Sequence, residues 1–348
     1  MRFDAIRRFL GWCSDHPGGL RADPNVAVRL ARPEERDPIL AFVRSMGFNA
    51  RDAKTWDGLG MGAMTAWDGD KLIGAIPLEP RCWQLRPGCV VASVHQTTVG
   101  VLPEYQGRGI GSRMQEELFQ HPPPGVELAT VFREDETSPA YRWYRRNGFR
   151  AAMRIAAWLL KTPTRPAAPP VYEVLDFDHP GVDWGGIDRL WQAGRVDQHG
   201  GFVCRSKRPR RDWLDAHPYR GHYTYRILQI RTSGELAAYA ILGVGQLHSE
   251  TIRVEIMEHA AGAAEQDPDN DLKHLIQATI HYAAEHDYRP VRWALTVGDP
   301  EAAIARELGF TQEWVFDLLM RPLPNCEITL PDAEERRRQW RYHSLDYS

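Results

Sequence analysis

The sequence has no hydrophobic run that approaches the roughly 20 residues needed to span a membrane. Its five cysteines are odd in number and scattered, and no two form a Cys-x-x-Cys pair, so they indicate neither a zinc site nor a disulfide framework. The net charge is only −3, which gives no global reason to expect nucleic acid as a partner. Residues 1–10 mix charged and apolar side chains and lack the core of a signal peptide. These absences predict a cytoplasmic protein with no metal, no nucleic acid partner and no membrane insertion.

The chain has 348 residues, of which 43% are hydrophobic, so its length predicts about two domains. Four prolines between Lys161 and Pro170 mark the boundary, because proline does not fit inside a helix or a central strand. We therefore expect an N-terminal extension (1–25), a first domain (26–161), a proline-rich linker (162–170), a second domain (171–322) and a C-terminal tail (323–348).

The two halves share one predicted order of secondary structure. Hydrophobic patterning and turn residues predict β, α, α, β, β, β, α, β, α, β in the first half. The expected strands lie at 26–30, 63–67, 72–78, 90–101, 126–132 and 151–160, and the helices at 33–46, 50–56, 108–119 and 139–147. The second half repeats the order, with strands at 172–175, 224–231, 235–244, 251–259, 291–297 and 313–320 and helices at 186–196, 210–216, 272–285 and 300–308.

A glycine-rich turn joins a predicted strand to a predicted helix in the first half. It reads Val99-Gly-Val-Leu-Pro-Glu-Tyr-Gln-Gly-Arg-Gly-Ile-Gly-Ser112. Glycine at 107, 109 and 111 allows backbone conformations that a side chain would block, and it bares successive N–H groups at a helix start. With the positive end of the helix dipole, these groups form a site for phosphate. The spacing matches neither the dinucleotide fingerprint Gly-x-Gly-x-x-Gly nor a P-loop that ends in Gly-Lys-Ser/Thr.

A second motif lies downstream, at Ser138-Pro-Ala-Tyr-Arg-Trp-Tyr-Arg-Arg-Asn-Gly-Phe149. Ser138 can cap a helix, and the proline after it suits the first turn. The helix is expected to end at Asn147-Gly148, since both residues tolerate the left-handed conformation. Tyr141 and Tyr144 lie one turn apart on the same side of this helix.

These two motifs resemble those of the GNAT acetyltransferase superfamily. Gln106 to Gly111 fits Gln/Arg-x-x-Gly-x-Gly/Ala, the family's acetyl-coenzyme A loop, and the helix at 138–149 is similar to the family's Ala-x-x-x-Tyr-x-x-x-Gly-Phe helix. The resemblance implies an α/β fold (α+β, with mixed sheets) of two tandem GNAT-like domains, each a mixed, mostly antiparallel sheet flanked by helices. It also implies acetyl-coenzyme A as the co-substrate and no metal.

The resemblance further implies which residues hold acetyl-coenzyme A. Backbone groups of Val99 and Val101 would hydrogen-bond the pantetheine arm like an added strand. The pyrophosphate would lie against the loop and the helix start, with Arg108 adding positive charge. The residues of this loop are Gln106, Gly107, Arg108, Gly109, Ile110, Gly111 and Ser112.

Two residues are candidates for the acid–base chemistry. The family's helix tyrosine usually sits beside the thioester sulfur, which implies Tyr144 as the general acid and leaves Tyr141 as the fallback. His95 stands where histone-type members carry a glutamate base, eleven residues before the loop. An imidazole, with an ordinary pKa of about 6.5, suits proton removal from an ammonium at working pH. A strand histidine that is merely satisfied by a neighbour, with proton removal by a water chain, stays as the alternative.

The second half lacks the phosphate loop. In its place the sequence reads Ala264-Glu-Gln-Asp-Pro-Asp-Asn-Asp271, with four acidic residues and no glycine turn. Negative side chains would repel a pyrophosphate, and the bare backbone donors are absent. We therefore expect a degenerate GNAT-like domain that binds no cofactor.

The expected acceptor is a primary amine of a small molecule. Residues 205–214, 217–219 and 223–226 resemble segments of GNAT-like proteins found with bacterial surface polysaccharide genes, which implies an amino sugar or a nucleotide sugar. Clustered arginine with tryptophan and tyrosine can bind phosphates and sugar rings. A solvated basic loop, a non-catalytic coenzyme A-binding sensor or scaffold, and an acyltransferase for a longer acyl donor or a protein or peptide amine stay open. A homo-oligomer is also left open.

Overall fold

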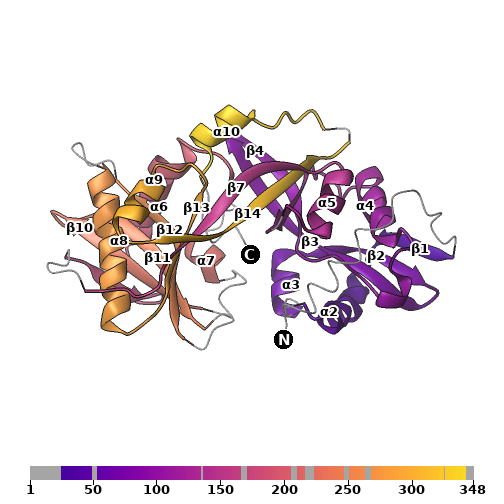
Figure 1. Ribbon diagram of the computed structural model, residues 1–348, viewed down its shortest axis with the longest axis horizontal. Helices are drawn as coiled ribbons and strands as arrows, with labels where there is room; N and C mark the ends of the chain where they lie inside the picture. Colours follow the sequence, from indigo (N-terminus) through magenta and orange to yellow (C-terminus); the bar gives the residue numbers. More distant parts are fainter. Residues whose placement is uncertain are drawn as a thin grey trace. The chain divides into compact units, whose positions relative to one another are not determined.

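The computed structural model describes residues 25–48, 53–134, 136–165, 171–204, 210–215, 223–246, 251–262, 268–324 and 326–341. They form two compact units, unit 1 and unit 2 (Figure 1). Several segments discussed above lie outside this description: residues 1–24, residues 50–52 of an expected helix, residues 205–209 and 216–222 of the arginine-rich segments, and residues 264–267 of the acidic stretch. None of the described helices is long and apolar enough to cross a membrane.

Neither compact unit is a continuous stretch of chain. Unit 1 comprises the residues up to Cys82, Val91–Ala152 and Phe316–Leu330. Unit 2 comprises Trp83–Val90, Met153–Val315 and the residues from Pro331 onward. The sequence predicted continuous halves, whereas each half contributes most of its last strand to the other compact unit. Local patterns show where strands lie, but the pairing of strands that are distant in sequence depends on the whole fold.

Unit 1 is built on a mixed sheet with the strand order β1-β2-β3-β4-β6-β14. β4 and β6 run parallel, whereas β1–β2, β2–β3 and β6–β14 are antiparallel pairs. The strands are β1 (Val26–Leu30), β2 (Gly62–Asp68), β3 (Lys71–Arg86), β4 (Cys89–Gln96), β5 (Gly100–Val101), β6 (Leu128–Arg133) and β14 (Thr311–Pro322). The described helices are α2 (Arg36–Ser45), α3 (Ala53–Leu59), α4 (Ile110–Gln120) and α5 (Pro139–Arg146), with 3-10 turns at Pro33–Glu35 and Pro103–Tyr105.

The predicted order of elements is confirmed, with one expected strand divided. The strand expected at 90–101 stops at Gln96, the end of β4, and resumes as the short β5. β4 pairs with β6 only as far as His95 and Thr130, whereas β5 pairs with β3. β4 and β6 therefore part beyond His95, directly before the chain enters the glycine loop.

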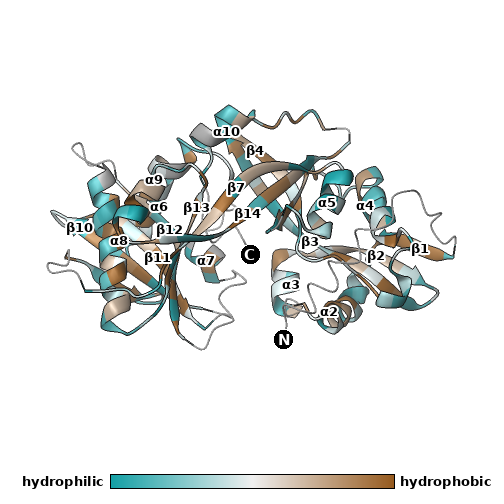
Figure 2. Cartoon of the chain, in the orientation of Figure 1, coloured by the Kyte–Doolittle hydropathy of each residue, from teal (hydrophilic) through white to brown (hydrophobic). Residues whose placement is uncertain are grey.

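Helices cover both faces of the unit 1 sheet. α4 and α5 enclose one core, which includes Val131 and Tyr144, and α2 and α3 enclose another, which includes Trp56 and Ala75. Each large apolar side chain buried in this way stabilises the fold by roughly 1.5–3 kcal/mol. α4 and α5 are mostly hydrophilic in Figure 2, because only the positions that face the sheet are apolar.

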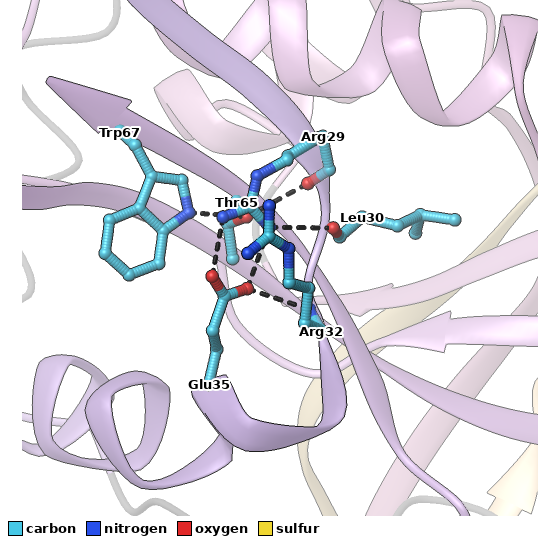
Figure 3. Close-up of polar contacts among 6 residues, drawn as sticks. All are labelled: Arg29, Leu30, Arg32, Glu35, Thr65 and Trp67. Carbon is cyan, nitrogen blue, oxygen red and sulfur yellow. Dashed lines mark hydrogen bonds and ion pairs between the residues drawn. The ribbon is translucent and has the colours of Figure 1, made fainter. Parts of the chain in front are cut away.

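An ion pair fixes the first strand to the start of the first helical segment (Figure 3). Arg29 on β1 donates two hydrogen bonds to the Glu35 carboxylate, at 2.8 and 2.5 Å. Glu35 also accepts from the backbone N–H of Arg32, and the Trp67 indole donates to Thr65 beside them. The hydrogen bond from Arg29 lowers the pKa of Glu35 to about 2. The pair therefore stabilises the fold above the ordinary carboxylate pKa of 4.5, and this contribution is lost as the pH falls toward 2.

Unit 2 repeats the layout on a second mixed sheet, with the strand order β7-β13-β12-β11-β10-β8. β12 and β13 run parallel, and the other pairs are antiparallel. The strands are β7 (Arg150–Leu160), β8 (Glu173–Asp176), β9 (Phe202–Cys204), β10 (Thr224–Thr232), β11 (Glu235–Gly245), β12 (Arg253–Ala261) and β13 (Val291–Thr296). The described helices are α6 (Trp184–Trp191), α7 (Arg210–Asp215), α8 (Pro268–Glu285), α9 (Glu301–Glu307) and α10 (Ala333–Gln339), with a π-helical turn at Gln192–Val196. The predicted repeat is thus confirmed, and β9 and α10 are additions that the sequence pattern does not predict.

Candidate active site

The glycine loop directs the chain into α4 through two left-handed residues. Gly107 and Gly109 have φ values of 76° and 75°, a conformation that L side chains rarely adopt. Gly111 lies inside α4 without a positive φ, which corrects the expectation that all three glycines supply unusual backbone angles. Within the described residues, the backbone N–H groups from Gly107 to Ser112 meet no backbone acceptor. The loop therefore presents a row of donors at the positive end of a helix.

Gln106 shapes the loop from inside. Its backbone N–H donates to the Pro103 carbonyl at 3.2 Å, and its side-chain amide donates to the Val101 carbonyl at 2.8 Å. The backbone N–H and the side-chain amide of Gln106, a residue that the sequence analysis assigned to the cofactor, therefore both have partners within the protein. Arg108 is exposed, with its guanidinium 5.0 Å from the centre of the Tyr105 ring. Of these two predicted cofactor residues, Arg108 is the one that offers a charge to an anion.

α4 and α5 meet beside the loop at Ser112 and Trp143. The Trp143 indole N–H donates to the Ser112 hydroxyl at 3.1 Å. A side-chain carbon added at Gly111 would lie 3.5 Å from the same indole, which is an ordinary van der Waals contact, so the packing of the two helices leaves room for a small side chain at this position. Because Ser112 accepts from Trp143, its own hydroxyl hydrogen stays available to an anion at the loop.

The strand end that precedes the loop is held by a pair of buried amides. Gln96 on β4 and Gln115 on α4 exchange hydrogen bonds through their side chains, and neither is exposed. Val101 is buried in β5, and Val99 packs against the same core while half-buried. The two glutamines fix the loop, the helix and the strand end as one piece. Sequence reasoning missed them, because a glutamine in a strand or a helix usually reads as a surface residue.

Tyr144 is fully buried on α5, and its hydroxyl oxygen accepts a hydrogen bond from Arg133 at the end of β6. Nη2 of Arg133 lies 2.9 Å from the hydroxyl oxygen, and the guanidinium carbon lies 4.6 Å from the ring centre. Burial raises the pKa of Tyr144, and the charge and hydrogen bond of Arg133 lower it in part. The sequence alone does not predict a role for Arg133, because a lone arginine after an apolar strand matches no motif.

Tyr141, the fallback for the general acid, is engaged elsewhere. Its hydroxyl donates to the Asp317 carboxylate on β14 at 2.8 Å, in a buried environment. Burial and this carboxylate raise the pKa of Tyr141 to about 12. A hydroxyl that already gives its hydrogen to a carboxylate is a poor proton donor to a substrate. Tyr144 is therefore the better placed of the two.

β14 holds α5 at two points. Asp317 lies in register with Arg133 across the β6–β14 ladder, so the residues that hold the two tyrosines are direct neighbours. Farther along β14, Arg321 donates to the Asn147 carbonyl at the end of α5. A positive charge at this end of a helix is favourable because it meets the negative end of the helix dipole. The helix that carries Tyr144 is thus fixed by residues about 175 positions later in the sequence.

His95 lies on the face of the sheet opposite Tyr144. Its Nδ1 is 2.9 Å from the Thr130 hydroxyl, and its ring centre is 5.1 Å from that of Phe132. The adjacent Val94 belongs to the core under α4 and α5, and successive side chains of a strand point to opposite faces. The structure therefore does not bring His95 and Tyr144 into contact. The two side chains lie on opposite faces of the sheet, close to the place where β4 and β6 stop pairing.

Unit 2 shows no counterpart of the glycine loop in the part that is described. The helix that follows β12 is α8, which begins at Pro268 and carries Asp271 in its first turn. An acidic residue at this place stabilises the helix itself and disfavours an anion. Over the same described ranges, no group of histidine, cysteine and acidic side chains could hold a metal ion.

Comparison with known proteins matches part of the chain to a known family and its fold to solved structures. Residues 62–151 match the family model of the acetyltransferase (GNAT) domain, whereas no match was found among curated proteins. A probable N-acyltransferase from Enterococcus faecalis is similar in fold, with 16% identity, a TM-score of 0.64 and coverage of 86% of this chain and 72% of that one. A GCN5-related N-acetyltransferase from Anabaena variabilis has 16% identity, a TM-score of 0.60 and coverage of 86% and 74%. A tandem GNAT protein from the clavulanic acid biosynthesis pathway has 14% identity, a TM-score of 0.56 and coverage of 87% and 100%.

Gly109→Ala tests whether the loop is an anion site. An alanine at this φ is strained, and we expect the strain and the added methyl group to disturb the row of loop donors that an anion would contact. We expect the affinity for coenzyme A, measured by calorimetry, to fall by roughly 10-fold or more. Gly125→Ala is the matched control, because Gly125 has a φ of 74° and nothing lies within 4 Å of an added Cβ. Equal affinities in the two folded variants would contradict the loop assignment.

Proposed function

Because the chain belongs to the GNAT superfamily of acetyltransferases, we propose that unit 1 moves an acetyl group from acetyl-coenzyme A to a primary amine of a small molecule. The observation that carries the proposal is the loop from Gly107 to Ser112, whose backbone donors at the start of α4 suit a pyrophosphate. The matched family region contains this loop and α5. Unit 2 is proposed to bind no cofactor, since its described part carries no such loop.

The residues around the loop fit a coenzyme A thioester. Arg108 and the hydroxyl of Ser112 add a charge and a donor to the loop's N–H groups. The backbone near Val99 and Val101 lies where β4 leaves β6, so the amides of a pantetheine arm could pair there as an added strand. When bound, acetyl-coenzyme A supplies an acyl group already activated as a thioester. The protein then has to orient the acceptor amine and to handle two protons.

Tyr144 is proposed as the general acid toward the departing sulfur. Its oxygen accepts from Arg133, and no described carboxylate takes its hydrogen, in contrast to Tyr141. The hydroxyl hydrogen of Tyr144 is therefore available for transfer. Rigid support by α5 and β6 favours a fixed direction of transfer.

His95 is proposed as the group that accepts the proton of the amine. Its ring is buried and oriented by the Thr130 hydroxyl, on the face of the sheet away from α4 and α5. An amine that approached from that face would meet His95, while the thioester sulfur would meet Tyr144 from the other. A chain of water molecules that removes the proton is the alternative, with His95 as a structural residue.

The acceptor is proposed as a small amine, with amino sugars first among the compounds to test. The support for sugars comes from residues 205–214, 217–219 and 223–226, of which 205–209 and 217–219 lie outside the described part of the chain. Tyr223 and Tyr225 are buried in the unit 2 core, and Arg226 forms an ion pair with Asp176 at 2.9 Å.

Tyr144→Phe removes one hydroxyl and keeps the ring. If Tyr144 protonates the leaving sulfur, kcat should fall by roughly 10²-fold while the affinity for acetyl-coenzyme A holds. The measurement is the release of free thiol from acetyl-coenzyme A with a panel of small amines. Tyr141→Phe is the control, and it should lower the melting temperature by removing the bond to Asp317, with little change in kcat. Binding of acetyl-coenzyme A without thiol release for any amine would instead favour a non-catalytic sensor.

His95→Ala should lower kcat/KM by roughly 10²-fold at neutral pH, where most of the acceptor amine is protonated. The loss should shrink as the pH rises, because neutral amine then forms without a base. His121→Ala is the control, since the His121 side chain is 68% exposed and pairs only with Glu117 among the described residues. Parallel pH–rate profiles of His95→Ala and the parent would show that His95 is a structural residue.

A further inference from the structure

The hydrogen bond between Arg133 and Tyr144 can have only one direction. A guanidinium carries N–H donors and no acceptor, so the Tyr144 oxygen must accept in the 2.9 Å contact. The hydroxyl hydrogen is therefore turned away from Arg133. Among the described residues, no acceptor takes that hydrogen.

The positive charge of Arg133 is not neutralised by an acidic side chain in the described part of the chain. Its Nη1 donates to the Phe132 carbonyl at 3.1 Å, its Nη2 donates to Tyr144, and its buried Nε has no described partner. Asp317, its register neighbour on β14, accepts from Tyr141 instead. The cation therefore acts on the phenol of Tyr144, both at the oxygen and over the ring face.

The other surroundings of Tyr144 are aromatic. The rings of Trp143 and Phe149 lie 4.8 and 5.1 Å from its ring, centre to centre. The further charged groups of α5, such as Arg145, are exposed, and the Asp317 carboxylate accepts a hydrogen bond from Tyr141. Arg133 is thus the charged side chain that sets the electrostatic environment of this hydroxyl.

We infer that Arg133 is a positioning residue for acetyl transfer, which directs the Tyr144 hydrogen toward the leaving sulfur and stabilises the phenolate left behind. The inference deepens the proposed function and rests on it. In this step the Tyr144 O–H bond breaks while the sulfur, which departs with the electron pair of its bond to the acetyl carbon, gains the hydrogen. The phenolate then takes a proton from water. A nearby guanidinium favours this transfer because it lowers the pKa of the phenol.

The test follows kcat at saturating substrates from neutral to alkaline pH. In the parent, kcat should fall at high pH as Tyr144 loses the hydrogen that it must donate. Arg133→Gln removes the charge, so the pKa of Tyr144 rises. We expect kcat to fall by roughly 10-fold at neutral pH and the alkaline limb to move to higher pH, with the KM for acetyl-coenzyme A unchanged. Arg133→Lys restores the charge and should return the limb toward its position in the parent. Arg142→Gln, an exposed arginine on the same helix, should change neither.

A double-mutant cycle separates positioning from mere structural support. If Arg133 acts through the Tyr144 hydroxyl, adding Arg133→Gln to Tyr144→Phe should cost little beyond Tyr144→Phe alone. If the losses in kcat of the two single variants multiply in the double variant, or if the alkaline limb of Arg133→Gln does not move, the inference is overturned while the proposed function stands. A Tyr144→Phe variant with full kcat would overturn the acid assignment itself. If Arg133→Gln does not fold, the same cycle with Arg133→Met, which also removes the charge, decides by the same criterion.

Discussion

The pairing of β6 with β14 is the constraint on which the candidate active site depends. It runs antiparallel from Leu128–Pro322 to Arg133–Asp317 and places the residues that hold Tyr141 and Tyr144 side by side. Without β14, Tyr141 would lose its carboxylate partner and the end of α5 would lose Arg321. β6 also pairs with β4 up to His95, the candidate base. The same strand carries Arg133, which donates to the candidate acid Tyr144, and it pairs with β14. Fragments that stop before β14 would therefore lack part of the site.

Tyr141 and Tyr144 show how their surroundings separate the roles of similar side chains. Both lie on one side of α5, and burial raises the pKa of both. A carboxylate takes the hydrogen of Tyr141, which makes that residue a structural tie. A cation donates to the oxygen of Tyr144, which leaves its hydrogen without an acceptor among the described residues.

Local sequence patterns predict the parts of the site that lie close together in the chain. The glycine loop, the start of α4 and the position of Tyr144 all follow from short motifs, because each depends on turn and cap residues within one strand–helix segment. Arg133, Asp317 and the Gln96–Gln115 pair could not be predicted in this way. Their roles arise only after distant strands and helices pack, and none has a local signal. The same reason explains why the units exchange their last strands, although the order of elements was predicted in both halves.

The two units share an order of strands and helices but differ where a cofactor would bind. Unit 1 enters its helix through glycines with positive φ, and unit 2 enters the corresponding helix α8 with an acidic residue in the first turn. The fold therefore allows an anion site in both units, and the residues at the helix start decide whether one exists. Unit 2 also lies on the path of the chain to β14. The segment from Met153 to Val315 belongs to unit 2, and most of β14 follows it as part of unit 1.

Titration of the full-length protein with acetyl-coenzyme A in a calorimeter tests the central claim most directly. We expect one binding site per chain, and we expect Gly109→Ala to abolish or greatly weaken binding at that site without exposing a second. Two sites per chain, or a single site whose affinity is unchanged by the loop substitution, would show that the glycine loop is not the cofactor site.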